Sequence, residues 1–269
     1  MKIILWIGNA PNQKALANKL HEAFPITGIV LETRPSKTKV NFSLFIEKVI
    51  EKTFLSSIGK AWMGMLNKYK TEYPSFPNTA LIDVENINSD DAYHFTNKLN
   101  PDLILVSGTR LVNERMLQLK PTIGILNLHT GISPYVKGGP NCTNWCLANK
   151  DYHLIGNTIM WIDKGIDSGN ILTTELTPLD GNENLKELHF KVMEHAHALY
   201  IKAVKFIGEQ KTQSIKQSDI AKGKTFYNKD WNLIQKMKLV IHFTKFKKYS
   251  INGDVHSKQK TIKTIPLSS

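Results

Sequence analysis

Short apolar runs recur along the first half of the chain, and each has the length of one buried strand. Stretches with apolar residues at helical spacing lie between them, for example residues 13–24 and 43–70. Strands that alternate with helices are typical of βαβ units, so the pattern predicts an α/β fold: a Rossmann-like, mostly parallel sheet with helices on both faces. The predicted strands are residues 3–8, 27–32, 79–84, 102–108 and 122–129.

The pattern changes in the second half of the chain. Residues 154–163 and 170–177 are typical of two strands joined by a turn, and residues 182–207 have the spacing of a long helix. The remainder is rich in lysine and only weakly periodic. We therefore predict one main domain over residues 1–207 and a small C-terminal appendage or tail over residues 208–269.

Charge and composition narrow the class of protein without choosing one. The 35 Lys and Arg residues against 23 Asp and Glu give a net charge of +12, which favours an anionic partner such as a nucleic acid or a phosphorylated small molecule. Part of this excess belongs to a composition that is generally rich in Lys, Asn and Ile. The two cysteines are too few for a disulfide framework, and the first apolar run is too short to span a membrane. We expect a cytoplasmic protein with no membrane contact.

The sequence disfavours two common kinds of site. The first predicted strand ends at a single glycine, Gly8. The absence of the G-x-G-x-x-G motif after it argues against a dinucleotide-binding site. Cys142 and Cys146 stand four residues apart without a second pair, so we expect them to pack as small apolar residues on one helix face. His195 and His197 are two apart on a predicted helix and do not share a face. We expect no metal.

The candidate chemistry lies in the stretch NLHTGISPYVKGG, residues 127–139. Asn127 and His129 alternate at the end of a predicted strand, so both side chains can project on the same side. Asp167 follows in a later turn. An amide, an imidazole and a carboxylate suit chemistry at a carbonyl group: the amide stabilises an oxyanion, the imidazole handles a proton and the carboxylate orients the imidazole. Spacing alone leaves a structural alternative open, in which His129 is a buried histidine, Asn127 caps a strand end and Asp167 forms a turn.

Three motifs together resemble the folate-dependent formyltransferase family. They are SGTRLV at 107–112, NLHTGISPYVKGG at 127–139 and IGNTIMWIDKGIDSGNIL at 155–172, in that order. The resemblance is good over residues 102–177, and before residue 100 it is limited to a compatible order of strands and helices. It implies a formyltransferase-type fold and N10-formyltetrahydrofolate as the formyl donor.

The resemblance also implies roles for single residues. Asn127 and His129 match the pair that stabilises a tetrahedral oxyanion and handles a proton when a neutral amine attacks the formyl carbon. Asp167 matches the family's carboxylate and would favour the cationic form of His129. The pterin is expected to bind largely to backbone groups of two loops, which here are Gly108, Thr109, Arg110 and Leu111 in one and Asp163, Lys164, Gly165 and Ile166 in the other.

The amine acceptor is less constrained. Glycinamide ribonucleotide formyltransferases are shorter and carry a glycine-rich loop that this chain lacks. Methionyl-tRNA formyltransferases are longer, although the Lys-rich C-terminal part suits a phosphate backbone. The resemblance is closest to the nucleotide-sugar branch, which implies the amine of a nucleotide-linked amino deoxy sugar, with Tyr135, Lys137 and Trp145 as candidate contacts. Lys137 also fits a solvated loop charge, and Trp145 also fits the core.

Further alternatives stay open. The segment between Pro35 and Pro77 fits a lid, a dimer contact or a helical elaboration, and the chain fits either a monomer or a homodimer. The non-enzymatic alternative is a basic nucleic-acid-binding module with a vestigial site. The joint presence of Asn127, His129 and Asp167 argues against it.

Overall fold

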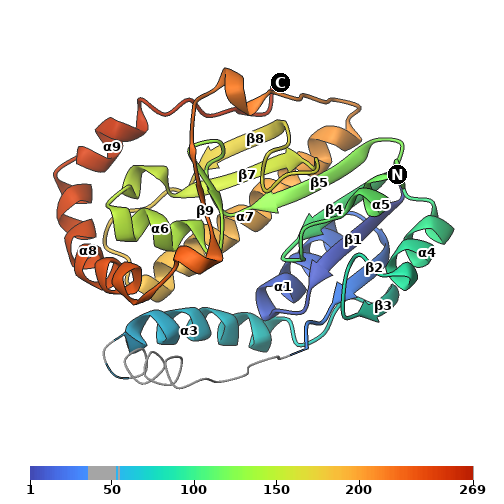
Figure 1. Ribbon diagram of the computed structural model, residues 1–269, viewed down its shortest axis with the longest axis horizontal. Coiled ribbons are helices and arrows are strands. Elements are labelled where there is room, and N and C mark those ends of the chain that lie inside the picture. Colours follow the sequence, from blue (N-terminus) through green and yellow to red (C-terminus); the bar gives the residue numbers. More distant parts are fainter. Residues whose placement is uncertain (36–52, 54, 269) are drawn as a thin grey trace.

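A seven-stranded sheet forms the centre of the computed structural model, which describes residues 1–35, 53 and 55–268 (Figure 1). The strand order is β3-β2-β1-β4-β5-β7-β8; the first five strands are parallel, and the last two are antiparallel to their neighbours. The predicted α/β fold with a mostly parallel sheet is confirmed. The strands are β1 (Ile3–Gly8), β2 (Ile26–Glu32), β3 (Ala80–Val84), β4 (Leu103–Ser107), β5 (Gly124–His129), β7 (Gly156–Trp161) and β8 (Ile171–Leu176).

Helices cover both faces of this sheet, with α1 (Pro11–Ala23), α3 (Ser56–Glu72) and α7 (Leu185–Gly208) on one side, and α4 (Asp90–Leu99) and α5 (Glu114–Leu117) on the other (Figure 1). The central strand β1 is buried along its whole length. Its odd-numbered side chains join the core cluster with α1 and α7, and its even-numbered side chains join the cluster with α4 and α5. A continuous apolar run is what a strand covered on both faces requires.

The helix ends agree with simple capping rules. Ser89 is the N-cap of α4, and its side chain accepts a hydrogen bond from the N–H of Ala92. Helix α7 begins directly after its N-cap residue Asn184, which forms a capping box with Glu187. Part of the predicted helical stretch 43–70 lies outside the described residues. Within the described part of the chain, no helix is long and apolar enough to cross a membrane.

Residues 208–268 pack closely against the rest of the molecule. Strand β9 (Lys224–Phe226) pairs with β6 (Val136–Gly138) in the loop that follows β5. Residues 208–268 also form two helices, α8 (Leu233–Ile251) and α9 (Asp254–Gln259). Helix α8 lies against α6 (Cys142–Asn149). Helices α6 and α8 contribute to one apolar cluster. The division of the chain at residue 207 stays a prediction, but the two parts share this core.

Tyr200 on α7 fixes the helix to the backbone of two strands. Its side chain is fully buried, and burial raises the pKa of its hydroxyl. The hydroxyl accepts the N–H of Val106 at 2.9 Å and donates to the carbonyl of Leu126 at 2.8 Å. Leu126 precedes Asn127, so this contact fixes the backbone of β5 next to the candidate site.

Replacing Tyr200 by Phe removes this bridge while keeping the ring. We expect the free energy of unfolding to fall by about 1–3 kcal/mol, because Val106 and Leu126 lose the partner that the hydroxyl gives them in a buried position. Urea unfolding measures the change. The control is Tyr93→Phe, whose hydroxyl has no hydrogen bond to a described residue and which should shift stability by less than about 0.5 kcal/mol. Equal stability of the two variants would contradict the bridging role.

Candidate functional site

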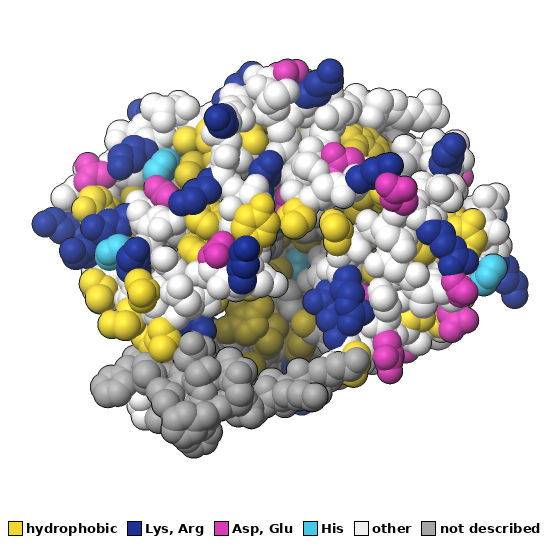
Figure 2. Space-filling model, in the orientation of Figure 1, with side chains coloured by type: hydrophobic (Ala, Val, Ile, Leu, Met, Phe, Trp, Pro, Cys, Tyr) yellow, Lys and Arg dark blue, Asp and Glu magenta, His cyan; other side chains and the backbone are white. Residues whose placement is uncertain are grey.

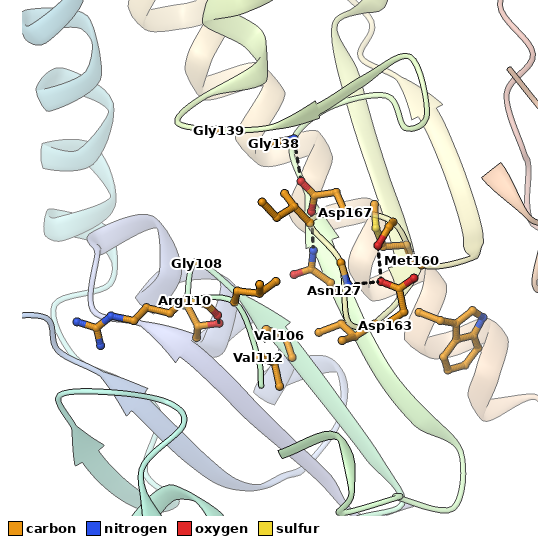
Figure 3. Close-up of a pocket in the computed structure, with 18 of the residues that line it drawn as sticks. Val106, Gly108, Arg110, Val112, Asn127, Gly138, Gly139, Met160, Asp163 and Asp167 are labelled. Carbon is orange, nitrogen blue, oxygen red and sulfur yellow. Dashed lines mark hydrogen bonds between the residues drawn. The ribbon is translucent and has the colours of Figure 1, made fainter. Parts of the chain in front are cut away.

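A cavity of about 490 Å³ lies beyond the carboxyl ends of β4 and β5 (Figure 3). Sites in open α/β sheets form at this edge, because loops from several strands converge there. Its walls come from the loop after β4 (residues 108–112), the turn between β7 and β8 (residues 163–169) and residues 226–228 of the C-terminal part. Asn127 projects into it from β5, between these walls.

The structure brings Asn127, His129 and Asp167 together. The carboxylate of Asp167 contacts both other side chains: its Oδ1 is 3.4 Å from Nδ2 of Asn127 (Figure 3), and its Oδ2 is 3.3 Å from Nδ1 of His129. Asn127 and His129 lie two residues apart on β5, as the alternation of a strand requires. His129 is only 8% exposed, so its ring is enclosed behind Asp167.

The surroundings of His129 favour its doubly protonated form. Nε2 lies 3.2 Å from the carbonyl of Val136, which can only accept, and Nδ1 faces the carboxylate of Asp167, which also accepts. Burial disfavours the charged ring, but the Asp167 carboxylate, the neighbouring Cys142 thiol and the Val136 carbonyl outweigh it, so that the pKa of His129 rises from 6.5 to about 10. A pKa raised in this direction favours the imidazolium at neutral pH.

Two glycines of the loop after β5 make room for this arrangement. A Cβ on Gly131 would lie 2.5 Å from Nε2 of His129, so the ring fits only beside a glycine. Gly138 has a φ of +90°, and its N–H donates to Oδ2 of Asp167 at 2.9 Å. A Cβ there would also collide with the carbonyl of Phe226. The glycines of NLHTGISPYVKGG therefore shape the site itself as well as the turn.

The turn that carries Asp167 is held from within and from the C-terminal part. Asp163 accepts hydrogen bonds from the N–H of Gly165 and the hydroxyl of Ser168. Gln217, which is buried, donates to the carbonyls of Asp167 at 2.7 Å and Gly169 at 2.8 Å. Sequence reasoning missed Gln217, because it belongs to no motif and its partners are about fifty residues away. Its only sequence signal is its position in the segment that was predicted to be an appendage.

Most of the predicted donor-binding residues line the cavity. The exception is Lys164, whose ammonium group is exposed and pairs with Glu114 at 2.7 Å. The residues on the walls are Gly108, Thr109, Arg110 and Leu111 in the first loop and Asp163, Gly165 and Ile166 in the second. Their role in binding stays a prediction.

The three predicted acceptor contacts lie outside this cavity wall. Trp145 is 3% exposed, stacks on Phe226 with ring centroids 4.4 Å apart and donates to the carbonyl of Gly139. These contacts agree with the alternative that Trp145 belongs to the core, and its contact with an acceptor stays a prediction. The hydroxyl of Tyr135 accepts the N–H of Lys263, and Lys137 lies on β6 beside β9.

The residues considered for metal binding have other partners. Cys142 and Cys146 are buried thiols in the apolar cluster with α8, and Cys142 lies 3.5 Å from Nε2 of His129. His195 pairs with Glu175, whereas His197 is buried beside Tyr69. The described residues contain no group of three or more His, Cys, Asp or Glu side chains that could hold a metal ion.

Removing the charge of Asp167 tests what protonates His129. In Asp167→Asn, burial is no longer outweighed, so the pKa of His129 should fall from about 10 to below its ordinary 6.5. Between about pH 6 and pH 9, the imidazole of His129 should stay charged in the wild type and should be neutral in Asp167→Asn. NMR titration of the ring measures this. The control is Asp90→Asn on the surface, which should leave the titration of His129 unchanged. The same titration midpoint in the wild type and Asp167→Asn would contradict the assignment.

Comparison with known proteins places this geometry in a family context. The family model described as Formyl transferase matches residues 59–204, which is more than half of the chain. A methionyl-tRNA formyltransferase of Clostridium tetani is 30% identical over 144 residues, which are 53% of this chain and 46% of that protein. The chain thus spans about half the length of the curated relatives it matches.

Two solved structures share the fold over most of this chain. A sugar N-formyltransferase from Shewanella has a TM-score of 0.58 at 14% identity, over 90% of this chain and 88% of the other. An N-formyltransferase from Helicobacter canadensis, in complex with folinic acid and dTDP-3-aminofucose, has a TM-score of 0.56 at 15% identity, over 93% and 82%. Likeness at these identities concerns the fold alone. From the family model's match over more than half of its length, the chain belongs to the formyl transferase family.

Proposed function

We propose that this protein is an N-formyltransferase that moves the formyl group of N10-formyltetrahydrofolate to the primary amine of a nucleotide-linked amino deoxy sugar. The observation that carries the proposal is the contact of Asn127, His129 and Asp167 at the edge of one cavity. Family membership supports the transfer of a formyl group. The choice of acceptor is a separate part of the proposal and has separate support.

The residues around the cavity fit a folate donor. Its volume of about 490 Å³ lies in the range of small-molecule sites. Leu111 and Ile166, on facing loops, are 55% and 45% exposed, and they offer apolar surface that a flat ring can cover. Backbone groups of the two loops can hydrogen-bond the polar edges of that ring. The donor, when bound, supplies a formyl carbon that an amine can attack.

The three side chains have complementary tasks in such a transfer. Asn127 has one amide N–H near Asp167 and a second that can donate to the formyl oxygen as negative charge develops there. The imidazolium of His129 adds positive charge in a buried setting, where it is weakly screened. Asp167 holds both groups in place, and its carboxylate can accept the proton that the amine loses.

The support for a nucleotide-sugar acceptor is that two structures of the same fold are a sugar N-formyltransferase and an N-formyltransferase in complex with dTDP-3-aminofucose. The Shewanella and Helicobacter canadensis structures match about nine-tenths of this chain, including much of the C-terminal part that braces the site. The second candidate is methionyl-tRNA, which is favoured by the 30% identity to methionyl-tRNA formyltransferases. Those relatives match only about half of this chain, and that is why we prefer the sugar nucleotide.

An acceptor panel tests the proposal. The formation of tetrahydrofolate from N10-formyltetrahydrofolate is followed with dTDP- and UDP-linked amino deoxy sugars, methionyl-tRNA and glycinamide ribonucleotide. We expect turnover with at least one sugar nucleotide and none with the other two acceptors. Turnover with methionyl-tRNA alone would replace the proposed acceptor. Donor binding without turnover on any member would reject the whole set, and the absence of donor binding would reject the formyl transfer itself.

His129→Ala separates catalysis from binding. We expect kcat to fall by about 10²–10⁴-fold, because Asp167, which contacts Asn127, loses the imidazolium that pairs with it. The dissociation constant of folinic acid should stay within about threefold, since the loops that line the cavity are unchanged. The control is His94→Ala, an exposed histidine on α4 that should leave both quantities unchanged. Wild-type turnover in His129→Ala would contradict the role assigned to the imidazolium.

A further inference from the structure

Arginine is rare in this chain and is concentrated at one place. Only Arg34, Arg110 and Arg115 occur among 35 Lys and Arg residues. Two of them, Arg34 and Arg110, share the carboxylate of Glu32, which ends β2 and is 2% exposed. Arginine differs from lysine in its planar fork of donors, which matches carboxylate and phosphate groups. The use of arginine at this one carboxylate therefore calls for a reason beyond charge.

The hydrogen bonds of Glu32 fill its capacity to accept. Oε2 accepts from Nε of Arg34 and the N–H of Arg110, both at 2.9 Å. Oε1 accepts from Nη1 of Arg110 and the N–H of Ile87, both at 3.0 Å. A carboxylate offers about four acceptor positions, so Glu32 is saturated. It orients both guanidinium groups but neutralises only one of the two positive charges.

Both guanidinium groups keep donors for another ligand. Arg34 uses one further N–H on the carbonyl of Gly108, and Arg110 uses one on the carbonyl of Glu85. With five N–H donors each, both retain others that have no partner among the described residues. Their side chains are 49% and 38% exposed, so these donors are accessible. The result is a pair of guanidinium groups that are held in place by Glu32 and together keep a net positive charge.

The pair lies at the same edge of the sheet as Asn127, and the guanidinium group of Arg110 is directed away from that residue (Figure 3). Gly108, which Arg34 contacts, directly follows β4, the strand next to the one that carries Asn127, and neighbouring strands are about 5 Å apart. Gly8, at the end of β1, packs on Gly108 and has no side chain that could separate Arg34 from Gly108. Figure 2 shows a hollow in the same face, with dark blue Lys and Arg side chains at its rim. An acceptor with its amine at Asn127 and its anion at Arg34 would lie across the end of β4.

We infer that the side chains of Arg34 and Arg110, oriented by Glu32, bind the diphosphate of the acceptor, whereas the predicted role of Arg110 in donor binding concerns its backbone. The inference rests on the proposed function, because it assigns one part of the sugar nucleotide to these residues. Paired guanidinium groups can each give two parallel hydrogen bonds to phosphate oxygens. Held in advance by a buried carboxylate, they lose little side-chain freedom when the ligand binds.

Arg34→Ala is the test, because Arg34 is half-exposed and does not line the donor cavity. We expect the KM for the sugar nucleotide to rise about 10- to 100-fold, with kcat within about threefold and the KM for the donor unchanged. Arg34→Lys should restore only part of the affinity, because it keeps the charge and loses the fork. The matched control is Arg115→Ala, which removes an arginine paired with Asp90 on the surface and should change neither KM.

Pyrophosphate binding separates this inference from the proposed function. Calorimetry of the full chain with pyrophosphate should show binding in the wild type and in Arg115→Ala, and a loss of about tenfold or more in Arg34→Ala. This readout needs no turnover, so the loss would support the diphosphate site even if every acceptor failed. Equal binding of pyrophosphate by all variants, or none by the wild type, would overturn it. Turnover of a sugar nucleotide with an unchanged acceptor KM in Arg34→Ala would also overturn it, and the formyltransferase proposal would stand.

Discussion

The carboxylate of Asp167 is the point on which the site depends. It accepts the N–H of Gly138 and faces the donors of Asn127 and His129, so that three separate segments converge on two oxygen atoms. A carboxylate that is largely withdrawn from water needs such partners, because an unpaired buried charge is costly. The same charge keeps His129 protonated. One interaction therefore fixes the geometry and the protonation state of the site together.

This carboxylate is positioned from outside the sheet. Asp167 lies in a turn and has a φ of +47°, which aspartate tolerates better than most residues. Gln217 holds the backbone of that turn, and Phe226 lies against Gly138 on the other side of the cavity. The Lys-rich C-terminal part is thus a component of the site. Its packing on α6 and the loop after β5 links the stability of that part to the geometry of the cavity.

Glu32 repeats the principle at the end of β2. Like Asp167, it is a carboxylate at the carboxyl edge of the sheet that accepts from groups far apart in the sequence. Asp167 orients an imidazolium, and the saturated carboxylate of Glu32 orients two guanidinium groups. Parallel strands favour such shared carboxylates, because the carboxyl ends of the strands lie side by side and bring loops from distant parts of the chain to one edge.

The sequence by itself determined the sheet and the three residues of the candidate site. Strand β1 was predictable because a strand covered on both faces must be apolar throughout, and Asn127 and His129 because alternation places them on one side. Asp167 was recognised from its motif. These features depend on neighbouring residues, so a local pattern contains them.

Only the tertiary structure decided what surrounds those residues. It enclosed Trp145 in the core, brought Gln217 to a turn fifty residues away and placed Arg34 and Arg110 on one carboxylate. No local pattern records these contacts, because each depends on how distant segments pack. Burial and charge pairing are properties of the assembled fold, and they determine here which side chains remain available for chemistry.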